Sequence, residues 1–193
     1  MIYFTADSHF NHRNICRGTS QWSAVNGTRD YVDLEQMNAA ILHRINHAVR
    51  PDDTLYHLGD FAFGNKDEIP ALRARISCKN VHLIMGNHDQ HYVKKRPELF
   101  EGFSSISYYK EIRYNKLLIS MCHYPLGSWN EIGKGGINLH GHCHSNYTRT
   151  VGRQMDVGFD AIGMPINIVT VYEIMSTVDP VLVDGHNEET NYG

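Results

Sequence analysis

Histidines, aspartates and an asparagine gather in short polar segments that directly follow largely apolar runs of sequence. The clearest example is Gly86-Asn87-His88-Asp89, which follows the run 81–85. An amide oxygen, an imidazole and a carboxylate can bind a metal ion or move a proton, whereas apolar side chains cannot. A strand that ends in such a segment therefore predicts the edge of a chemical site.

The same arrangement recurs elsewhere in the chain. The other segments that follow an apolar run are Asp7-Ser8-His9, Gly59-Asp60, Cys122-His123 and His140-Gly141-His142-Cys143-His144. Ligands bind at the carboxyl ends of strands in open α/β sheets, so these strand ends can share one site. The sequence contains 13 histidines, and histidine is the commonest metal ligand.

Each motif has an ordinary explanation when it stands alone. Asp7 and His9 lie on one face if the first strand continues through them, yet exposed polar residues commonly share a face without binding anything. Gly59-Asp60 is a frequent turn sequence, and the histidines of the last segment can be buried and hydrogen-bonded. The metal hypothesis depends on the whole set, because two ions that activate one water need several His and carboxylate ligands.

Composition indicates one domain without a strongly basic surface. The 193 residues suffice for one hydrophobic core, so we expect a single domain over 1–183 and a polar tail over 184–193. The net charge of −3 argues against tight, sequence-indifferent binding to long nucleic acid. The four cysteines lack CxxC spacing, and we find no secretory signal and no apolar run of transmembrane length. We therefore expect a cytoplasmic protein with reduced thiols and no membrane partner.

Apolar patterns predict alternating strands and helices in the first half of the chain and mostly strands in the second. The expected helices are 30–49, 66–76 and 90–100, and the expected strands are 2–6, 54–58, 81–85, 104–109, 111–121, 137–139, 147–151, 154–157 and 168–174. Asp33 and Gln36 form a capping box in the first helix, whose length makes the strands on either side of it parallel. The strands at 104–109 and 111–121 are expected to pair as a hairpin. Residues 127–136 are expected to form a mobile loop beside the site.

The ordered motifs resemble the signature of the calcineurin-like metallophosphoesterases. The matching residues are Asp7-x-His9, Gly59-Asp60, Gly86-Asn87-His88-Asp89, His123 and Gly141-His142-x-His144. The segments 3–15 and 53–64 further resemble small single-domain phosphoesterases of bacteria and their phages. These relatives also have a segment like 156–161, for which the resemblance gives no residue role. The implied fold is a four-layer αββα sandwich, in which two mixed β-sheets are flanked by helices.

The resemblance implies a centre of two divalent metal ions that share one ligand. One ion would be held by Asp7, His9, Asp60 and His144, and the other by Asp60, Asn87, His123 and His142. Mn²⁺ suits this set of nitrogen and oxygen ligands, and Zn²⁺, Fe or Ni²⁺ are also compatible with it. His88, held by Asp89, would give a proton to the leaving oxygen. A hydroxide that bridges the ions would attack the phosphorus in line.

One departure from the family pattern bears on the substrate. In relatives that cleave phosphomonoesters, an Asp-Arg-Gly stretch follows Gly-Asp and its arginine grips the terminal phosphate, whereas residues 61–64 here are Phe-Ala-Phe-Gly. The missing arginine favours a small, singly charged diester, such as a cyclic nucleotide or an RNA or DNA end. The candidate substrate-binding residues are His12, Arg13, Asn14 and Arg149.

Other functions stay open at this level. His12, Arg13, Arg17 or Arg149 could replace the missing arginine, although solvated surface charge explains each of them about as well. A phosphomonoesterase is therefore the alternative activity, and a scaffold of the same fold without catalysis is a third possibility. Phe61, Phe63 and Trp129 either line the pocket or pack in the core. The oligomeric state is not predicted.

Overall fold

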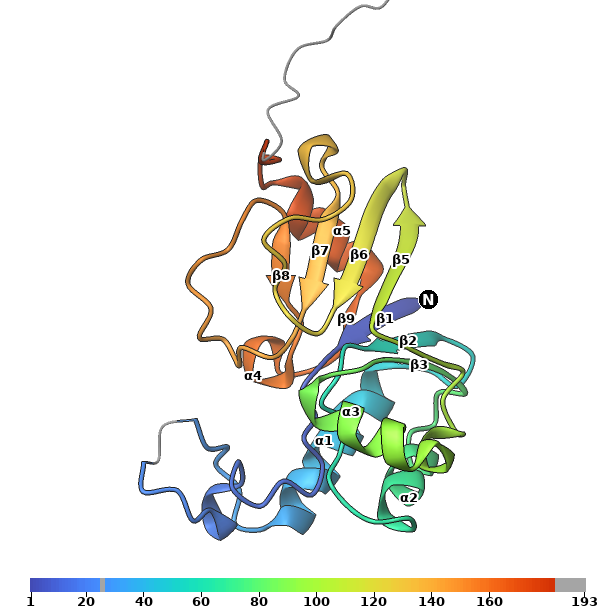
Figure 1. Ribbon diagram of the computed structural model, residues 1–193, viewed down its shortest axis with the longest axis vertical. Helices are drawn as coiled ribbons and strands as arrows, with labels where there is room; N and C mark the ends of the chain where they lie inside the picture. Colours follow the sequence, from blue (N-terminus) through green and yellow to red (C-terminus); the bar gives the residue numbers. More distant parts are fainter. Residues whose placement is uncertain (25–26, 183–193) are drawn as a thin grey trace, which may run out of the picture.

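Two mixed β-sheets pack face to face, and the helices lie mostly below the first sheet in the view of Figure 1. The computed structural model describes residues 1–24 and 27–182. One sheet has five strands and the other has four. This arrangement confirms the predicted α/β class and the predicted pair of mixed sheets.

The first sheet is mainly parallel. Its strands are β1 (Ile2–Thr5), β2 (Thr54–His57), β3 (Asn80–Ile84), β4 (Ser105–Ser107) and β9 (Ile166–Asn167). They lie in the order β4-β3-β2-β1-β9, and only β9 runs antiparallel to its neighbour. The carboxyl ends of β1, β2 and β3 therefore meet at one edge of the sheet.

The second sheet brings two further strand ends toward that edge. Its strands are β5 (Tyr109–Tyr114), β6 (Leu117–Cys122), β7 (Ile137–His140) and β8 (Gln154–Asp156), in that order. β6, β7 and β8 are parallel, and β5 is antiparallel to β6. The residues after β6 and β7 are the expected ligands His123, His142 and His144.

Five α-helices and three short 3₁₀ turns complete the described fold. They are α1 (Leu34–Ala48), α2 (Glu68–Ala74), α3 (Asn87–Lys95), α4 (Phe159–Ile162), α5 (Ile168–Ser176), η1 (Arg17–Thr19), η2 (Pro97–Phe100) and η3 (Ile132–Lys134). Successive side chains of β2 point to opposite faces of the sheet and pack into two separate core clusters. Leu55 packs in a cluster with α1 and α2, whereas Tyr56 packs in a cluster between the two sheets.

α1 crosses between β1 and β2, which are parallel as predicted. The helix begins at Leu34 because the Asp33 side chain accepts a hydrogen bond of 2.8 Å from the Gln36 amide. The expected capping box is only half formed, since the Gln36 side chain accepts from the amide of Val32 rather than from that of Asp33. Met37, Ile41 and Ile45 form the buried stripe that holds the helix on the sheet.

α3 starts earlier than the sequence pattern indicated. It begins at Asn87, directly after Gly86, and ends before Pro97, which opens η2. The Asp89 side chain accepts a hydrogen bond from the Gly86 amide and so caps the first turn. Asn87 and His88 therefore stand on the first turn of a helix.

The predicted hairpin at 104–109 and 111–121 is wrong. β4 pairs in parallel with β3 in the first sheet, and the hairpin in the second sheet is formed by β5 and β6. Its turn is Asn115-Lys116, where both residues have positive φ angles, 47° and 67°. Asn is one of the few residues that tolerates this backbone conformation, as two-residue hairpin turns require.

Two other predicted strands are also wrong. Residues 147–151 form no strand, and residues 168–174 belong to the helix α5. The β-branched residues at the start of α5 favoured a strand, yet Asn167 caps the helix by accepting from the amide of Thr170. Ile168, Val171 and Met175 are buried at helical spacing, so packing overrides the local preference.

The loop 127–136 is held by its tryptophan. Trp129 is buried, and its indole N–H donates to the carbonyl of Gly136. This side chain therefore packs inside the loop. The expected polar tail, 184–193, lies outside the described residues.

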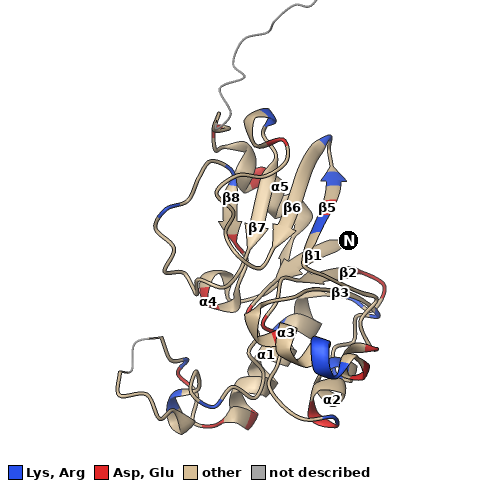
Figure 2. Ribbon diagram, viewed as in Figure 1, with Lys and Arg blue, Asp and Glu red and all other residues tan. Residues whose placement is uncertain are grey.

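Charged residues of both signs are scattered along the ribbon in Figure 2, with a basic stretch at the end of α3. Lys94 and Lys95 lie in the last turn of that helix. Among the described helices, none combines the length and the apolar character needed to cross a membrane.

Candidate metal centre

The predicted ligands follow strand ends at which the backbone turns sharply. Asp7, His9, Asp60, His142 and His144 all have positive φ angles, between 47° and 70°. β1 ends at Thr5, so the strand does not continue through Asp7 and His9. Non-glycine residues rarely adopt this conformation. Its repetition among candidate ligands indicates that the chain is bent to aim these side chains at one place.

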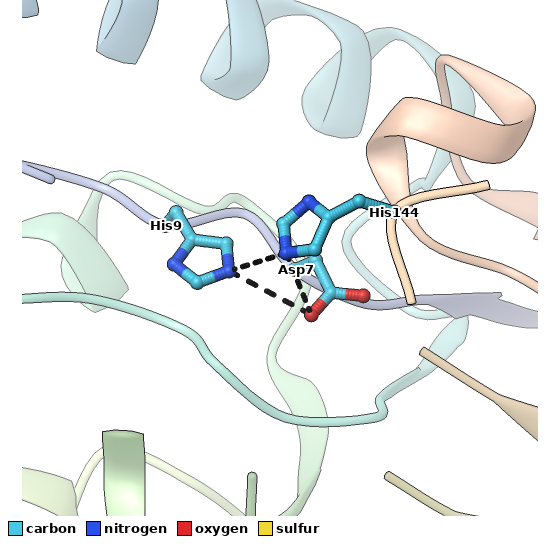
Figure 3. A group of neighbouring side chains, drawn as sticks. All are labelled: Asp7, His9 and His144. Carbon is cyan, nitrogen blue, oxygen red and sulfur yellow. Dashed lines mark hydrogen bonds and ion pairs between the residues drawn. The ribbon is translucent and has the colours of Figure 1, made fainter. Parts of the chain in front are cut away.

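Asp7, His9 and His144 form a first cluster, drawn in Figure 3. Nε2 of His9 lies 3.7 Å from Oδ1 of Asp7 and 3.2 Å from Nε2 of His144, which is itself 4.0 Å from Oδ1 of Asp7. Asp7 is fully buried, and its Oδ1 has no hydrogen-bond partner within the described chain. A buried carboxylate oxygen without a donor is costly unless a cation binds it.

Asp60 joins this cluster to a second one. Its Oδ2 lies 3.7 Å from Nε2 of His9 and 3.5 Å from Nε2 of His123. The same nitrogen of His123 lies 3.1 Å from Oδ1 of Asn87, and His142 completes a group with Asp60 and His123. One carboxylate oxygen therefore faces ligands of both clusters, as a bridging ligand must.

Glycines leave room for the two carboxylates. A Cβ at Gly86 would lie 2.1 Å from Oδ1 of Asp60, and a Cβ at Gly141 would lie 2.4 Å from Oδ2 of Asp7. Any other residue at these positions would displace the carboxylates. Gly59, with a φ of +97°, also lies tightly against Gly86. The glycines of the motifs thus have a packing role beside the ligands.

These residues fit a pair of divalent metal ions. Every predicted ligand reaches one of the two clusters, and the set mixes imidazole nitrogens with carboxylate and amide oxygens. Such a mixed set suits Zn²⁺, Mn²⁺, Fe or Ni²⁺ and gives no choice among them. The orphaned oxygen of Asp7 supplies independent support, because it needs a positive partner.

Charges within the clusters shift the pKa values in opposite directions. Burial would raise the pKa of Asp7 and of Asp60, but the neighbouring histidines outweigh it and hold both values below the usual range. Burial would lower the pKa of His123 and of His144, but hydrogen bonds and charges from Asp60, Asp160 and Asp7 raise them. The carboxylates are therefore ionised and ready for a cation.

His88 stands beside the clusters at the surface of the site. Its Nε2 lies 3.8 Å from Oδ2 of Asp60, and its side chain is 40% exposed. Its backbone amide donates to Oδ1 of Asp60, which fixes the start of α3 against that carboxylate. An exposed imidazole next to the clusters can reach the oxygen of a bound substrate.

Asp89 has a different role from the one expected. Its buried carboxylate accepts hydrogen bonds from the backbone amides of Asp60, Phe61 and Gly86, at 2.7, 3.0 and 2.9 Å. Within the described residues it makes no hydrogen bond to His88. Burial raises its pKa to about 6, although the backbone donors oppose this shift. Asp89 therefore fixes the loop that carries Asp60 rather than the ring of His88.

Asp160 and Arg29 belong to the site but were not identified from the sequence. Nδ1 of His144 donates to Oδ2 of Asp160 at 2.5 Å, and Arg29 binds both oxygens of Asp160. Arg29 also donates to the backbone carbonyls of Asp7 and Ser8. The segment 156–161 was noted without a role, and these bonds give Asp160 the role of orienting His144.

The predicted substrate-binding residues divide into two groups. The His12 ring lies 5.3 Å from that of His9 and 6.0 Å from that of His88, and burial lowers its pKa to about 4. His12 is thus neutral at pH 7 and cannot replace the arginine as a cation. Asn14 accepts from the amide of Gln21 and closes its own loop.

The two arginines of that prediction lie at the periphery. Arg13 lines a cavity of about 240 Å³ beside Phe63, and Arg149 is exposed between β7 and β8. Their roles stay predictions. Arg17, the other cation considered, forms an ion pair with Asp30 at 2.8 Å.

The two phenylalanines after Asp60 separate into core and site. Phe61 is fully buried in the cluster with α1 and α2. The ring of Phe63 stacks on His12 at 4.3 Å and lies 4.8 Å from His88. An aromatic wall therefore borders the clusters where the sequence lacks the arginine of monoesterases.

A comparison with family models agrees with this geometry. The model described as Calcineurin-like phosphoesterase matches residues 1–193. The chain belongs to this family. Calcineurin-like phosphoesterases are metal-dependent hydrolases of phosphoric esters, typically with two metal ions, so the two clusters agree with the family's chemistry.

Individual relatives are similar over most of the chain. An uncharacterised protein of Methanocaldococcus jannaschii is 29% identical over 148 residues, which are 76% of this chain and 70% of the relative. The gene 66 protein of Mycobacterium phage L5 is 27% identical and covers 91% of this chain and 94% of its own. A crystal structure of a protein of unknown function from Aquifex aeolicus has a TM-score of 0.63 at 24% identity, with coverage of 90% and 98%. That likeness concerns the fold.

Proposed function

We propose that this calcineurin-like phosphoesterase is a phosphodiesterase that hydrolyses a small diester, such as a cyclic nucleotide or a nucleic-acid end. The observation that carries the proposal is the position of Asp60, whose Oδ2 faces His9 of the first cluster and His123 of the second, with an exposed imidazole, His88, 3.8 Å from the same oxygen. Two divalent ions, with Mn²⁺ as our choice, would be held there by the predicted ligands.

The protein residues have separate tasks in this reaction. When bound, the ions supply an activated water and neutralise the phosphoryl oxygens. His88 holds a proton at Nε2 and delivers it to the leaving oxygen. Asp89 keeps the Asp60 loop in place through its bonds to backbone amides, and Asp160 sets the direction of His144. Both carboxylates act by positioning, Asp89 from the core and Asp160 from the surface.

The choice of a diester rests on the side chains that border the clusters. A monoester carries a second negative charge, which an arginine would neutralise. Here Phe63 lies against His88, and the neutral His12 adds no charge. A singly charged phosphodiester needs less compensation, so this apolar wall discriminates in its favour.

The test is a comparison of Mn²⁺-dependent rates on bis-p-nitrophenyl phosphate and p-nitrophenyl phosphate. These substrates share a leaving group and differ in charge. We expect a clearly higher kcat/KM for the diester. A higher value for the monoester would contradict the proposal and favour a phosphomonoesterase, whereas two bound ions without turnover of either would favour a scaffold.

A further inference from the structure

Trp22 lies beside the His9 side of the candidate metal centre, and the proposed chemistry gives it no task. Its side chain is 49% exposed, and its ring lies 6.0 Å from that of His12 in an edge contact. His12 in turn contacts His9 and stacks on Phe63. An aromatic surface therefore runs outward from the ligand His9 to an exposed indole.

Tyr124 occupies the corresponding place on the other side. It follows the ligand His123 directly in the sequence, and its side chain is 37% exposed. Its ring lies 5.1 Å from that of His123 and 4.8 Å from that of His142, with edge contacts to both. The phenol ring thus contacts the second cluster directly, whereas Trp22 is linked to the first cluster through His12.

The shared carboxylate separates these two aromatic residues. Oδ2 of Asp60 faces His9 at 3.7 Å and His123 at 3.5 Å. Trp22 connects to the centre through the His9 side, and Tyr124 connects through the His123 side. A phosphate bound at the centre would therefore have one exposed ring near each of the two groups that it esterifies.

Aromatic rings at such positions suit planar organic groups. Nucleobases stack on exposed Trp and Tyr rings, and this contact tolerates any base because every base has a π-face. The chain has a net charge of −3, which favours a short ligand over a long polyanion. A diester that carries one base on each side matches this arrangement.

We propose that Trp22 and Tyr124 are stacking subsites for the two bases of a phosphodiester that links two nucleosides. The inference rests on the proposed function, because it assumes that the scissile phosphate binds at the two clusters. It narrows the substrate class from small diesters in general to dinucleotides and nucleic-acid ends.

The first test compares a dinucleotide with its abasic analogue. The substrates are thymidylyl-(3′→5′)-thymidine and the same diester with tetrahydrofuran units in place of the nucleosides. We expect Trp22→Ala and Tyr124→Ala each to raise the KM for the dinucleotide, relative to the KM for the analogue, by about tenfold, the effect of one lost base stack. Trp22→Phe and Tyr124→Phe should restore the ratio.

The matched control is Ile174→Ala. Ile174 is 41% exposed on α5. This helix starts near the amino end of β1, because β9, which precedes it, runs antiparallel to β1. The candidate ligands Asp7 and His9 follow the other end of that strand. This control should keep the wild-type ratio. Equal changes of KM for both substrates in the Trp22 and Tyr124 variants would overturn the inference.

A second readout needs no turnover. The chain has two tryptophans, and Trp129 is buried, so thymidine 5′-monophosphate should quench the fluorescence of Trp22. The quench should be absent in Trp22→Phe. Quenching without diester hydrolysis would contradict the proposed function and support the base subsite. Hydrolysis without quenching or base preference would contradict the base subsite alone. If neither quenching nor hydrolysis is observed, the proposed function and the base subsite are both contradicted.

Discussion

The carboxylate of Asp160 accepts a hydrogen bond of 2.5 Å from Nδ1 of His144, the ring whose Nε2 faces Asp7 and His9. This bond places the proton on Nδ1 and leaves Nε2 free to bind a metal ion. Arg29 holds Asp160 in turn and also binds the backbone carbonyl of Asp7. One network therefore ties the first and the last of the ligand segments together.

Asp160→Asn should weaken one metal site and spare the other. The amide can still accept from His144, but the negative charge that supports the ring is lost. We expect the affinity of the first site to fall by about 10- to 100-fold, the usual effect of losing such a partner. Isothermal titration with Mn²⁺ measures this, with the exposed Asp179→Asn as control. Unchanged affinity at both sites would remove the role given to Asp160.

Gly141→Ala should damage both stability and metal binding. Its Cβ would lie 2.4 Å from Oδ2 of Asp7, so Asp7 must move. We expect the free energy of unfolding in urea to fall by about 1–3 kcal/mol, as overpacking usually costs. Gly127→Ala is the matched control, because nothing lies within 4 Å of a Cβ there. Equal behaviour of the two variants would contradict the packing role of Gly141.

Sequence patterns located the ligands better than the elements that carry them. The ligands follow strand ends, so a motif such as 86–89 can be recognised from a short stretch of sequence. The hairpin turn at Asn115-Lys116 was missed because it contains no glycine, and α5 was missed because its β-branched residues favour strands.

Contacts between distant segments could not be predicted from local patterns. Arg29 and Asp160 are 131 positions apart in the chain, and only the folded structure brings them together. Asp89 was identified but given the wrong partner, since three backbone amides surround its carboxylate. The spacing of residue types does not reveal that a buried carboxylate is hydrogen-bonded to backbone amides.

Metal affinity should rise with pH. The raised pKa values of His123 and His144 mean that protons compete with metal ions in the metal-free protein. Below the pKa of histidine in the unfolded chain, about 6.5, the protonated rings contribute their full stabilisation to the metal-free fold. That contribution is lost as the pH rises through the raised values. Titration of Mn²⁺ in buffers of different ionisation enthalpy should show proton release near pH 6.5 that diminishes by pH 9. Equal affinity at both pH values would contradict the assignment.

His88→Ala should lower turnover without loss of metal. An alkyl leaving group needs a proton, so we expect kcat to fall by about 10²–10⁴-fold on such a diester, the usual contribution of a general acid. The fall should be smaller on p-nitrophenyl esters, because nitrophenolate leaves as a stable anion. His91→Ala, on the same helix, is the control. Equal losses on both leaving groups would argue against proton donation.

The most direct test of the account is the metal stoichiometry of the wild-type protein and of Asp60→Ala. Oδ2 of Asp60 faces both clusters, so its removal should weaken both sites at once. We predict two Mn²⁺ ions per wild-type chain by elemental analysis after dialysis, and fewer than one in Asp60→Ala, with Asp52→Ala unchanged. Two tightly held ions in Asp60→Ala would contradict a centre bridged by this residue.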